Sequence, residues 1–257
     1  MQTSTSPRRK FIGKSLWGVS SLFIPYHLRH SKGPLRSWAN LARSDTTAFI
    51  CESGNLGQDP VFTLGLLLVP KPDEFENKLR TLRNQLSYFP RLSYSNNDRY
   101  QLPLAEAAIH WLFNESGCQF QVMAFDEKIS STNPDYPHAP SRWQLVRYKQ
   151  ACYDKLLDKA GINGRMIYVK YQSPLGPSAA YGQHFFAKSA CYYQPIDTRA
   201  SNALQMCSLL TGCVAAAAQN RDTGPVKQAL IEQLKAVLEH QHLQPALRWK
   251  DRFVFYV

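Results

Sequence analysis

Residues 1–44 combine positive charge with aromatic side chains. They contain eight Lys or Arg residues and no Asp or Glu, with Trp17, Tyr26 and Trp38 among the rings between them. Cations neutralise phosphates and flat rings stack on bases, so this arm is typical of a nucleic-acid-binding segment. A solvated leader whose apolar residues pack on the rest of the chain explains the composition equally well. The basic residues are Arg8, Arg9, Lys10, Lys14, Arg29, Lys32, Arg36 and Arg43.

The positive charge is concentrated in this arm. The formal net charge of the 257 residues is +11, yet residues 45–257 hold 22 basic and 19 acidic side chains. A hydrophobic content of 44% supports one sizeable core. We therefore expect a basic N-terminal arm over 1–44 and a single globular domain over 45–257. Nucleic acid, a protein partner, or both would bind through the arm.

A twin-arginine export signal is the alternative interpretation of the same segment. Arg8-Arg9-Lys10-Phe11-Ile12 precedes a weakly apolar stretch, but Gly and Ser dilute that stretch and no Ala-x-Ala cleavage site follows. The stretch is also too short and too polar to span a membrane. We expect a cytoplasmic protein without a transmembrane segment, with export as the minor alternative.

The cysteines indicate a reduced chain without a zinc site. None stands in Cys-x-x-Cys, and no His lies near them at zinc-finger spacing. Nucleophilic catalysis by Cys51 would need a nearby base, for which His110, His138 and His184 are candidates. A small buried side chain is the favoured interpretation of Cys51. The six cysteines are Cys51, Cys118, Cys152, Cys191, Cys207 and Cys213.

The hydrophobic patterns predict strands and helices in an α/β or α+β order around a mixed central sheet. An apolar run at 46–52 and a second at 61–69 predict a hairpin. Apolar residues from Phe75 to Phe89 recur at helical spacing, and Pro90 follows them. The other expected helices cover 102–113, 141–160, 202–220 and 226–238. The other expected strands cover 119–125, 165–171, 191–196 and 248–257.

Three stretches together resemble one family. They are Phe49-Ile50-Cys51-Glu52-Ser53-Gly54-Asn55 with Phe62-Thr63-Leu64-Gly65, then Phe120 to Asp126, and then Asp197-Thr198-Arg199-Ala200-Ser201 with the segment Leu204 to Gly212. In this order and spacing they resemble the domain of unknown function numbered 3800. The resemblance covers residues 46 to 240 and implies an RNase H-like α/β fold, with a mixed central sheet flanked by helices.

The resemblance also implies where chemistry would occur. Members typically begin with a strand ending in Asp-Glu-Ser-Gly, and carry a further Asp after a middle strand and another in a late helix. Such carboxylates would hold Mg²⁺ or Mn²⁺ for phosphodiester hydrolysis, because these ions prefer oxygen ligands.

This sequence departs from the family pattern at the acids. Cys51 stands at the first Asp position, Ser208 at the helix position, and Arg91 in the segment where the family has an acid. Asp126 is retained, as is Glu52. Glu52 cannot replace residue 51, because neighbouring side chains on a strand point to opposite faces. Glu52 could instead cap a turn or pair with a nearby base.

Three hypotheses follow from this departure. The leading one is a catalytically degenerate RNase H-like protein that binds nucleic acid or a protein partner without a cofactor, as an accessory component of a mobile-element or defence system. The second is an active Mg²⁺- or Mn²⁺-dependent nuclease whose site uses Asp126, Glu52 and Asp197. The third is a structural interaction subunit that binds no nucleic acid.

Overall fold

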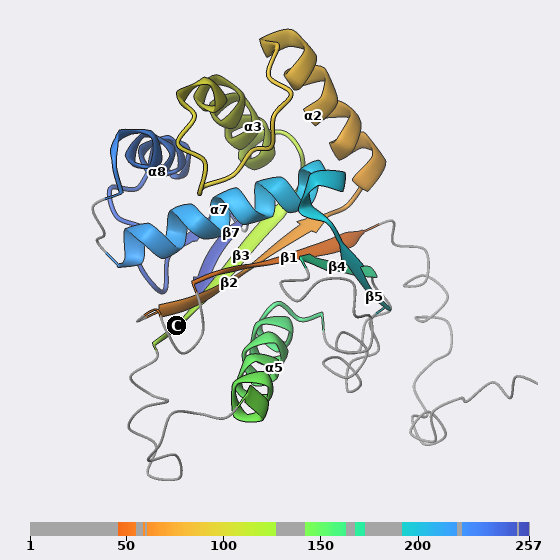
Figure 1. Ribbon diagram of the computed structural model, residues 1–257, viewed down its shortest axis with the longest axis vertical. Helices are drawn as coiled ribbons and strands as arrows, with labels where there is room; N and C mark the ends of the chain where they lie inside the picture. The colour runs from red at the N-terminus through yellow and green to blue at the C-terminus, as the bar shows by residue number, and fades with distance from the viewer. Residues whose placement is uncertain are drawn as a thin grey trace, which may run out of the picture. The chain divides into compact units, whose positions relative to one another are not determined.

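The described residues of the computed structural model form a seven-stranded sheet with helices on both faces (Figure 1). They are residues 46–54, 59, 61–126, 142–162, 168–172, 192–219, 223–250 and 252–256, and all belong to one compact unit, Trp38–Val257. The basic N-terminal arm, His138, His184 and Cys191 lie outside the described residues.

The sheet is mixed, with the order β5-β4-β1-β2-β3-β7-β6. β1, β2 and β3 are antiparallel neighbours, which confirms the predicted hairpin, while β4 runs parallel to β1 and β5 parallel to β4. At the other edge β7 runs parallel to β3 and β6 antiparallel to β7. The strands are β1 (Thr47–Ser53), β2 (Val61–Val69), β3 (Gln119–Asp126), β4 (Tyr168–Gln172), β5 (Tyr192–Ile196), β6 (Arg248–Trp249) and β7 (Phe253–Tyr256).

Two parallel strands added beside the first strand of an antiparallel meander give the strand order of the RNase H-like fold. The predicted fold class, an RNase H-like mixed sheet flanked by helices, is therefore confirmed.

The helices enclose two separate apolar layers. α2, α3, α7 and α8 cover one face of the sheet, and α5 covers the other (Figure 1). Among the described residues no helix is long and apolar enough to cross a membrane. The helices are α2 (Pro72–Leu86), α3 (Leu102–Asn114), α5 (Arg142–Lys159), α7 (Asn202–Ala218) and α8 (Pro225–Leu238), with short 3-10 turns η2 (Arg99–Gln101) and η3 (Thr198–Ala200).

Alternation along β1 determines which layer each side chain enters. Phe49 and Cys51 pack in the layer beneath α7, whereas Ala48 and Ile50 pack in the layer beneath α5. This follows from the two-residue period of a strand. The predicted assignment of Cys51 and Glu52 to opposite faces rests on the same geometry.

Two predicted boundaries are wrong for local reasons. The helical pattern extends to Phe89, but α2 ends at Leu86 because Ser87 adopts a left-handed backbone, φ 52°, and its neighbour's N–H closes the helix end. Phe89 is consequently 67% exposed. The single strand expected over 248–257 is instead two, β6 and β7, separated by a turn in which Lys250 has φ 44°.

Candidate functional site

Cys51 lies in a closed slot between β1 and α7. Its side chain has no exposed surface, and its thiol donates to the Leu204 carbonyl oxygen at 3.4 Å. From α7, the Cys207 thiol donates to the carbonyl oxygens of Phe49, at 3.2 Å, and Gly65, at 3.4 Å. The expectation that Cys51 is a buried small side chain is therefore confirmed. The α7 residue packed against β1 is Cys207, while Ser208 beside it is half-buried.

The environment of Cys51 keeps its thiol protonated. Burial raises the pKa of Cys51 well above its ordinary value, and the neighbouring Cys207 and the charge of Glu52 act in the same direction, against a smaller opposing effect of the Arg91 charge. Nucleophilic catalysis requires a thiolate that a substrate can reach. A buried thiol of raised pKa does not supply one. Of the candidate bases, His110 lies exposed on α3.

Close contact between α7 and β2 closes the slot. A Cβ atom built on Gly65 would lie 1.9 Å from Thr211 Oγ1 on α7 and 3.1 Å from the Phe120 ring. Gly65 is also the β2 residue directly beside Cys51 in the sheet. Packing therefore requires glycine at position 65. Its lack of a side chain lets α7 approach β2 closely, beside the β1 strand that carries Cys51.

Glu52 lies beneath the opposite face of the sheet. Lys149 Nζ, on α5, is 2.5 Å from its Oε2, and the Tyr153 hydroxyl donates to its Oε1. Lys149 also lies 5.8 Å from the centroid of the Phe62 ring. Glu52 thus pairs with a nearby base and ties α5 to β1, on the side of the sheet away from Cys51.

The sheet register separates Asp126 from the Cys51 slot. Cys51 is level with Gly65, and Gly65 with Val122 on β3. Asp126 is level with Val61, four residues farther along β3, which is roughly 13 Å at the rise of a strand. The structure does not describe the Asp126 side chain, so this placement concerns its backbone.

Asp197 follows the last residue of β5 and caps η3. Its Oδ1 accepts from the Arg199 backbone N–H at 2.8 Å, and its Oδ2 lies 3.2 Å from Arg199 Nη2. The hydrogen bond from the Arg199 backbone lowers the pKa of Asp197 most, and the hydrogen bond from the Arg199 side chain adds to this effect. The charge of Arg91 contributes less. Arg91 therefore lies within electrostatic reach of both Asp197 and Cys51. Arg91 and Arg199 are both exposed.

The residues present do not fit a divalent metal. The slot offers two buried thiols and carbonyl oxygens that already accept hydrogen bonds, whereas Mg²⁺ requires several free oxygen ligands in octahedral geometry. Within the part of the chain that the structure describes, no group of three His, Cys, Asp or Glu side chains converges. Glu52 and Asp197 are each held by a basic partner at separate places. The five described cysteines are free and buried.

A buried polar network that joins α2 to α7 includes residues that the sequence patterns did not predict to interact. Arg83 donates to Gln205 Oε1 at 2.8 Å, to Asn202 Oδ1 at 2.9 Å and to the Pro90 carbonyl at 2.7 Å. Gln205 also accepts from the Leu92 N–H at 2.9 Å, so its side chain hydrogen-bonds across the core. The sequence spacing could have indicated that Arg83 is buried, because Arg83 follows Phe75 and Leu79 at four-residue intervals on the buried face of α2.

Glu76, on the same helix, caps the beginning of α7. Its carboxylate accepts from the backbone N–H groups of Asn202, at 3.1 Å, and Ala203, at 3.2 Å, and from the Ser201 hydroxyl at 3.0 Å. A negative charge at a helix N-terminus is favoured by the helix dipole. Glu76 and Arg83 together fix where α7 starts, and hence which α7 residues face β1.

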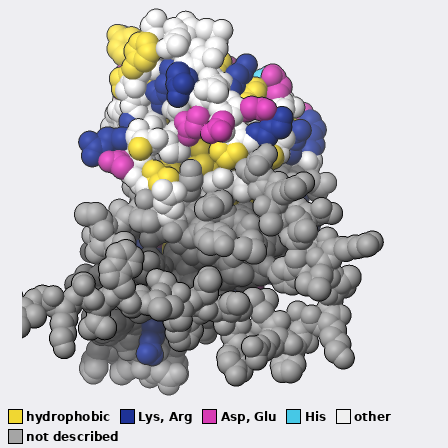
Figure 2. Space-filling model, turned by 90° about the vertical axis from the view of Figure 1, so that its right-hand side faces the viewer, with side chains coloured by type: hydrophobic (Ala, Val, Ile, Leu, Met, Phe, Trp, Pro, Cys, Tyr) yellow, Lys and Arg dark blue, Asp and Glu magenta, His cyan; other side chains and the backbone are white. Residues whose placement is uncertain are grey.

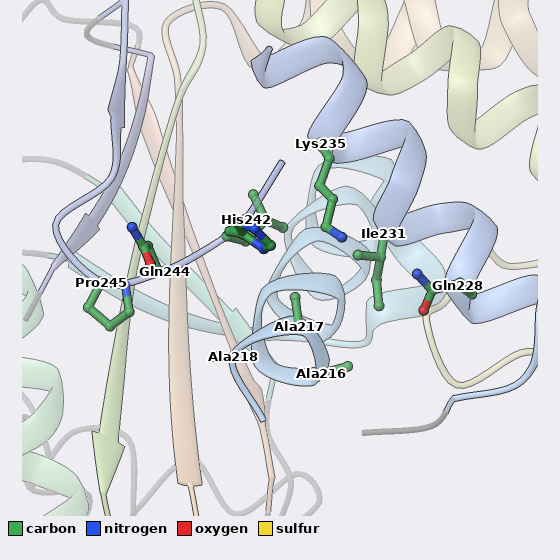
Figure 3. A pocket seen from close by; sticks show the side chains of 10 residues that line it. Ala216, Ala217, Ala218, Gln228, Ile231, Lys235, His242, Gln244 and Pro245 are labelled. Atoms are coloured by element: carbon green, nitrogen blue, oxygen red, sulfur yellow. The ribbon is translucent and has the colours of Figure 1, made fainter. Parts of the chain in front are cut away.

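A pocket of about 410 Å³ lies where α7 and α8 end, and it brings together none of the predicted site residues (Figure 3). Figure 3 shows Gln228, Ile231 and Lys235 of α8 facing the small residues at the end of α7. Lys235 is already 2.9 Å from the Glu232 carboxylate. The pocket lining thus combines small apolar residues with polar ones, and its lysine is already paired with a carboxylate.

The charges on the described surface are mixed in sign. On the face drawn in Figure 2, Lys and Arg side chains alternate with Asp and Glu among smaller apolar areas. This distribution agrees with the near-neutral composition of residues 45–257. No large area of one sign is visible on the described part of that face.

Comparisons with known proteins find structural likeness alone. No protein-family model and no curated protein matches the chain. The RNase HII complex with PCNA from Archaeoglobus fulgidus is 10% identical with a TM-score of 0.43, covering 74% of this chain and 73% of that chain. Ribonuclease H2 from Pyrococcus horikoshii OT3 is 12% identical with a TM-score of 0.42, covering 74% and 76%. The fold class rests on the strand order described above.

Proposed function

We propose that this chain is a catalytically degenerate RNase H-like protein, a divergent member of the domain of unknown function numbered 3800, that binds nucleic acid without cleaving it. The observation that carries the proposal is the Cys51 slot. A side chain without exposed surface, whose thiol donates to the Leu204 carbonyl, stands where the family pattern has a carboxylate. Helix α7 occupies the space above it, so no substrate phosphate can approach residue 51.

Binding would use the positive charges of the arm together with Arg91 and Arg199. The arm supplies eight cations without a carboxylate among them. Arg199 is 80% exposed at the end of β5, and Arg91 is exposed in the loop after α2. Contacts of this kind are made to the phosphate backbone and are independent of base sequence. A role in a mobile-element or defence system is a further part of the proposal, and it rests on the family analogy alone.

Salt-dependent binding tests the proposal. The full chain should bind single- or double-stranded DNA or RNA with an affinity that falls steeply as salt increases, measured by fluorescence anisotropy. A variant with the eight arm cations replaced by Gln keeps the chain length and should lose most of this affinity. Its urea unfolding midpoint should equal that of the unaltered chain. Unchanged affinity in the Gln variant would contradict the role of the arm.

A cleavage assay tests the loss of catalysis. The unaltered chain should cut none of the same substrates with Mg²⁺ or Mn²⁺. Metal-dependent cleavage that disappears in Asp126→Ala would instead establish the nuclease hypothesis. Stable co-purification with a protein, together with no binding of any nucleic acid, would favour the interaction subunit.

A further inference from the structure

A second cavity, of about 300 Å³, opens at the end of β1, on the same face of the sheet as Cys51. Ser53 and Gly54 line it from β1 and the following turn, and Gly212 lines it from α7. A Cβ atom on Gly212 would lie 2.5 Å from Tyr94 Cβ, so the Tyr94 ring packs directly on the helix and forms a second wall. The cavity is thus built by segments distant in sequence, and it does not include the closed Cys51 slot.

Polar atoms in this cavity lack partners. Gln219 Oε1, at the end of α7, and Thr223 Oγ1, before α8, are buried and accept or donate no hydrogen bond within the described part of the chain. Buried polar groups in folded proteins are nearly always satisfied, by protein, water or a ligand. Two such atoms in one cavity indicate that a polar group belongs there. The Ser53 hydroxyl adds a third polar atom to the wall.

Lys227 is the charged side chain among the described lining residues. It is half-buried, and its Nζ lies 5.6 Å from the centroid of the Tyr94 ring. Lys71, Lys149 and Lys235 each form an ion pair with a Glu, whereas Lys227 forms none with a described carboxylate. Its charge is therefore available to the cavity.

The lining favours a small oxyanion. An ammonium, hydroxyls and an amide that can turn its NH₂ inward are donors suited to phosphate oxygens. α8 begins at Pro225 beside Thr223, and the first N–H groups of a helix carry partial positive charge. The volume lies at the lower end of the range for ligand pockets, which suits one phosphate group and the sugar attached to it.

We propose that this cavity binds a terminal phosphate monoester, either at the end of a nucleic-acid strand or on a free nucleotide. The choice of a strand end rests on the proposed nucleic-acid binding, whereas the phosphate site itself does not. Lys227 neutralises the phosphate, and Thr223 and Gln219 complete its hydrogen bonds. Ser53, two residues beyond Cys51 on β1, contacts it from the sheet.

The test compares oligonucleotides of one sequence carrying a 5′-phosphate, a 3′-phosphate or no terminal phosphate. One phosphorylated strand should bind the full chain about tenfold more tightly than the unphosphorylated strand, the effect of one charge-assisted contact. Lys227→Met should abolish this preference while leaving binding of the unphosphorylated strand unchanged. Lys235→Met is the matched control, because Lys235 is half-buried on the same helix and lines the other pocket. It should retain the preference.

The outcomes separate this inference from the proposed function. Equal binding of all three strands overturns the terminal-phosphate site, even if nucleic-acid binding itself holds. If no strand binds, the proposed function fails; a nucleoside monophosphate that raises the melting temperature of the unaltered chain, and not of Lys227→Met, then still supports the site with a free nucleotide as its ligand. No stabilisation by a nucleoside monophosphate in that case overturns both.

Discussion

The thiols of Cys51 and Cys207 both donate to backbone carbonyl oxygens in a layer without solvent. A carbonyl oxygen attracts a donor and repels an anion. The side chain at position 51 must therefore be small and neutral, and either apolar or able to donate a hydrogen bond. Cysteine meets these conditions, since it behaves as a small hydrophobe with a weak S–H donor.

A carboxylate at position 51 should destabilise this protein. Cys51→Asp places an anion against the Leu204 carbonyl in a slot without exposed surface, where the charge of Arg91 opposes the burial cost only weakly. The substitution should lower the free energy of unfolding by about 3–5 kcal/mol. Cys51→Ala, the matched control, should cost about 1 kcal/mol. Urea unfolding with and without Mg²⁺ measures both. Recovery of Cys51→Asp by Mg²⁺ would show that the slot can open to hold a metal.

The buried thiols also predict a loss of stability at alkaline pH. Burial raises the pKa of Cys118 to about 11 and of Cys152 to about 12, from an ordinary value of 9.0. Above about pH 9 the unfolded chain therefore releases protons that the folded chain keeps. This stability is fully present below pH 9 and is lost as pH rises towards the folded values, at up to about 1.4 kcal/mol per pH unit for each thiol.

Urea unfolding midpoints between about pH 8 and 11 measure this decline. The double variant Cys118→Ala and Cys152→Ala is the control, because it keeps every other titrating group. Its curve should be flatter than that of the unaltered chain. Parallel curves would show that these thiols titrate alike in the folded and unfolded states.

At the scale of elements, α7 is placed by side chains of α2 and by small residues of the sheet. Glu76 holds its first turn, Arg83 and Gln205 fix its rotation, and Gly65 lets it approach β2. Because one helical residue turns the chain by about 100°, this rotation decides whether residue 207 or 208 meets β1. The polar network thus determines the composition of the Cys51 slot.

Removal of the Glu76 carboxylate, which caps the N-terminus of α7, should lower the stability of the protein. Glu76→Ala leaves two backbone N–H groups of α7 without their acceptor and should lower the free energy of unfolding by about 2–3 kcal/mol. Glu74→Ala is the matched control, since Glu74 lies on the same helix, is exposed and pairs only with the exposed Lys71 among the described residues. It should change the urea midpoint little. Equal losses in the two variants would contradict the capping role.

At the scale of the whole molecule, the arm and the body divide the charge unequally. The body carries a small excess of positive charge, and among its described residues Arg91 and Arg199 are exposed and act on the carboxylate of Asp197. Under the proposed function, these arginines add to the attraction of a nucleic-acid strand for the arm. Their contribution should be smaller than that of the arm.

Neutralising both arginines should reduce the salt dependence of binding. Arg91→Ala with Arg199→Ala should weaken binding to every sequence alike and lower the slope of log affinity against log salt by about one to two. Arg99→Ala with Arg248→Ala, two exposed arginines on η2 and at the β6 edge, is the control with the same change in net charge. A similar loss in both pairs would show a general charge effect and no particular surface.

The sequence by itself determined most of the elements and a mixed sheet in an α/β or α+β order, whereas the RNase H-like fold class was expected from the resemblance of three stretches to a known family. Strand and helix periods are local, so the β1–β2 hairpin, the buried α7 and the absence of a carboxylate at position 51 could all be predicted from residue order. Local patterns also placed Glu52 and Cys51 on opposite faces, because alternation is a property of the strand alone.

The tertiary structure alone decided which side chains meet. Three features depend on contacts between residues more than one hundred positions apart. Cys207 packs against β1, Arg83 is buried against Gln205, and Ser53 shares a cavity with Lys227. Sequence periodicity indicates which face of a helix or strand is buried. It does not indicate how a helix is rotated against the sheet, because that rotation depends on the packing of all the side chains between them. The cavity lined by Ser53 and Lys227 therefore exists only because α7 and α8 pack beside the end of β1.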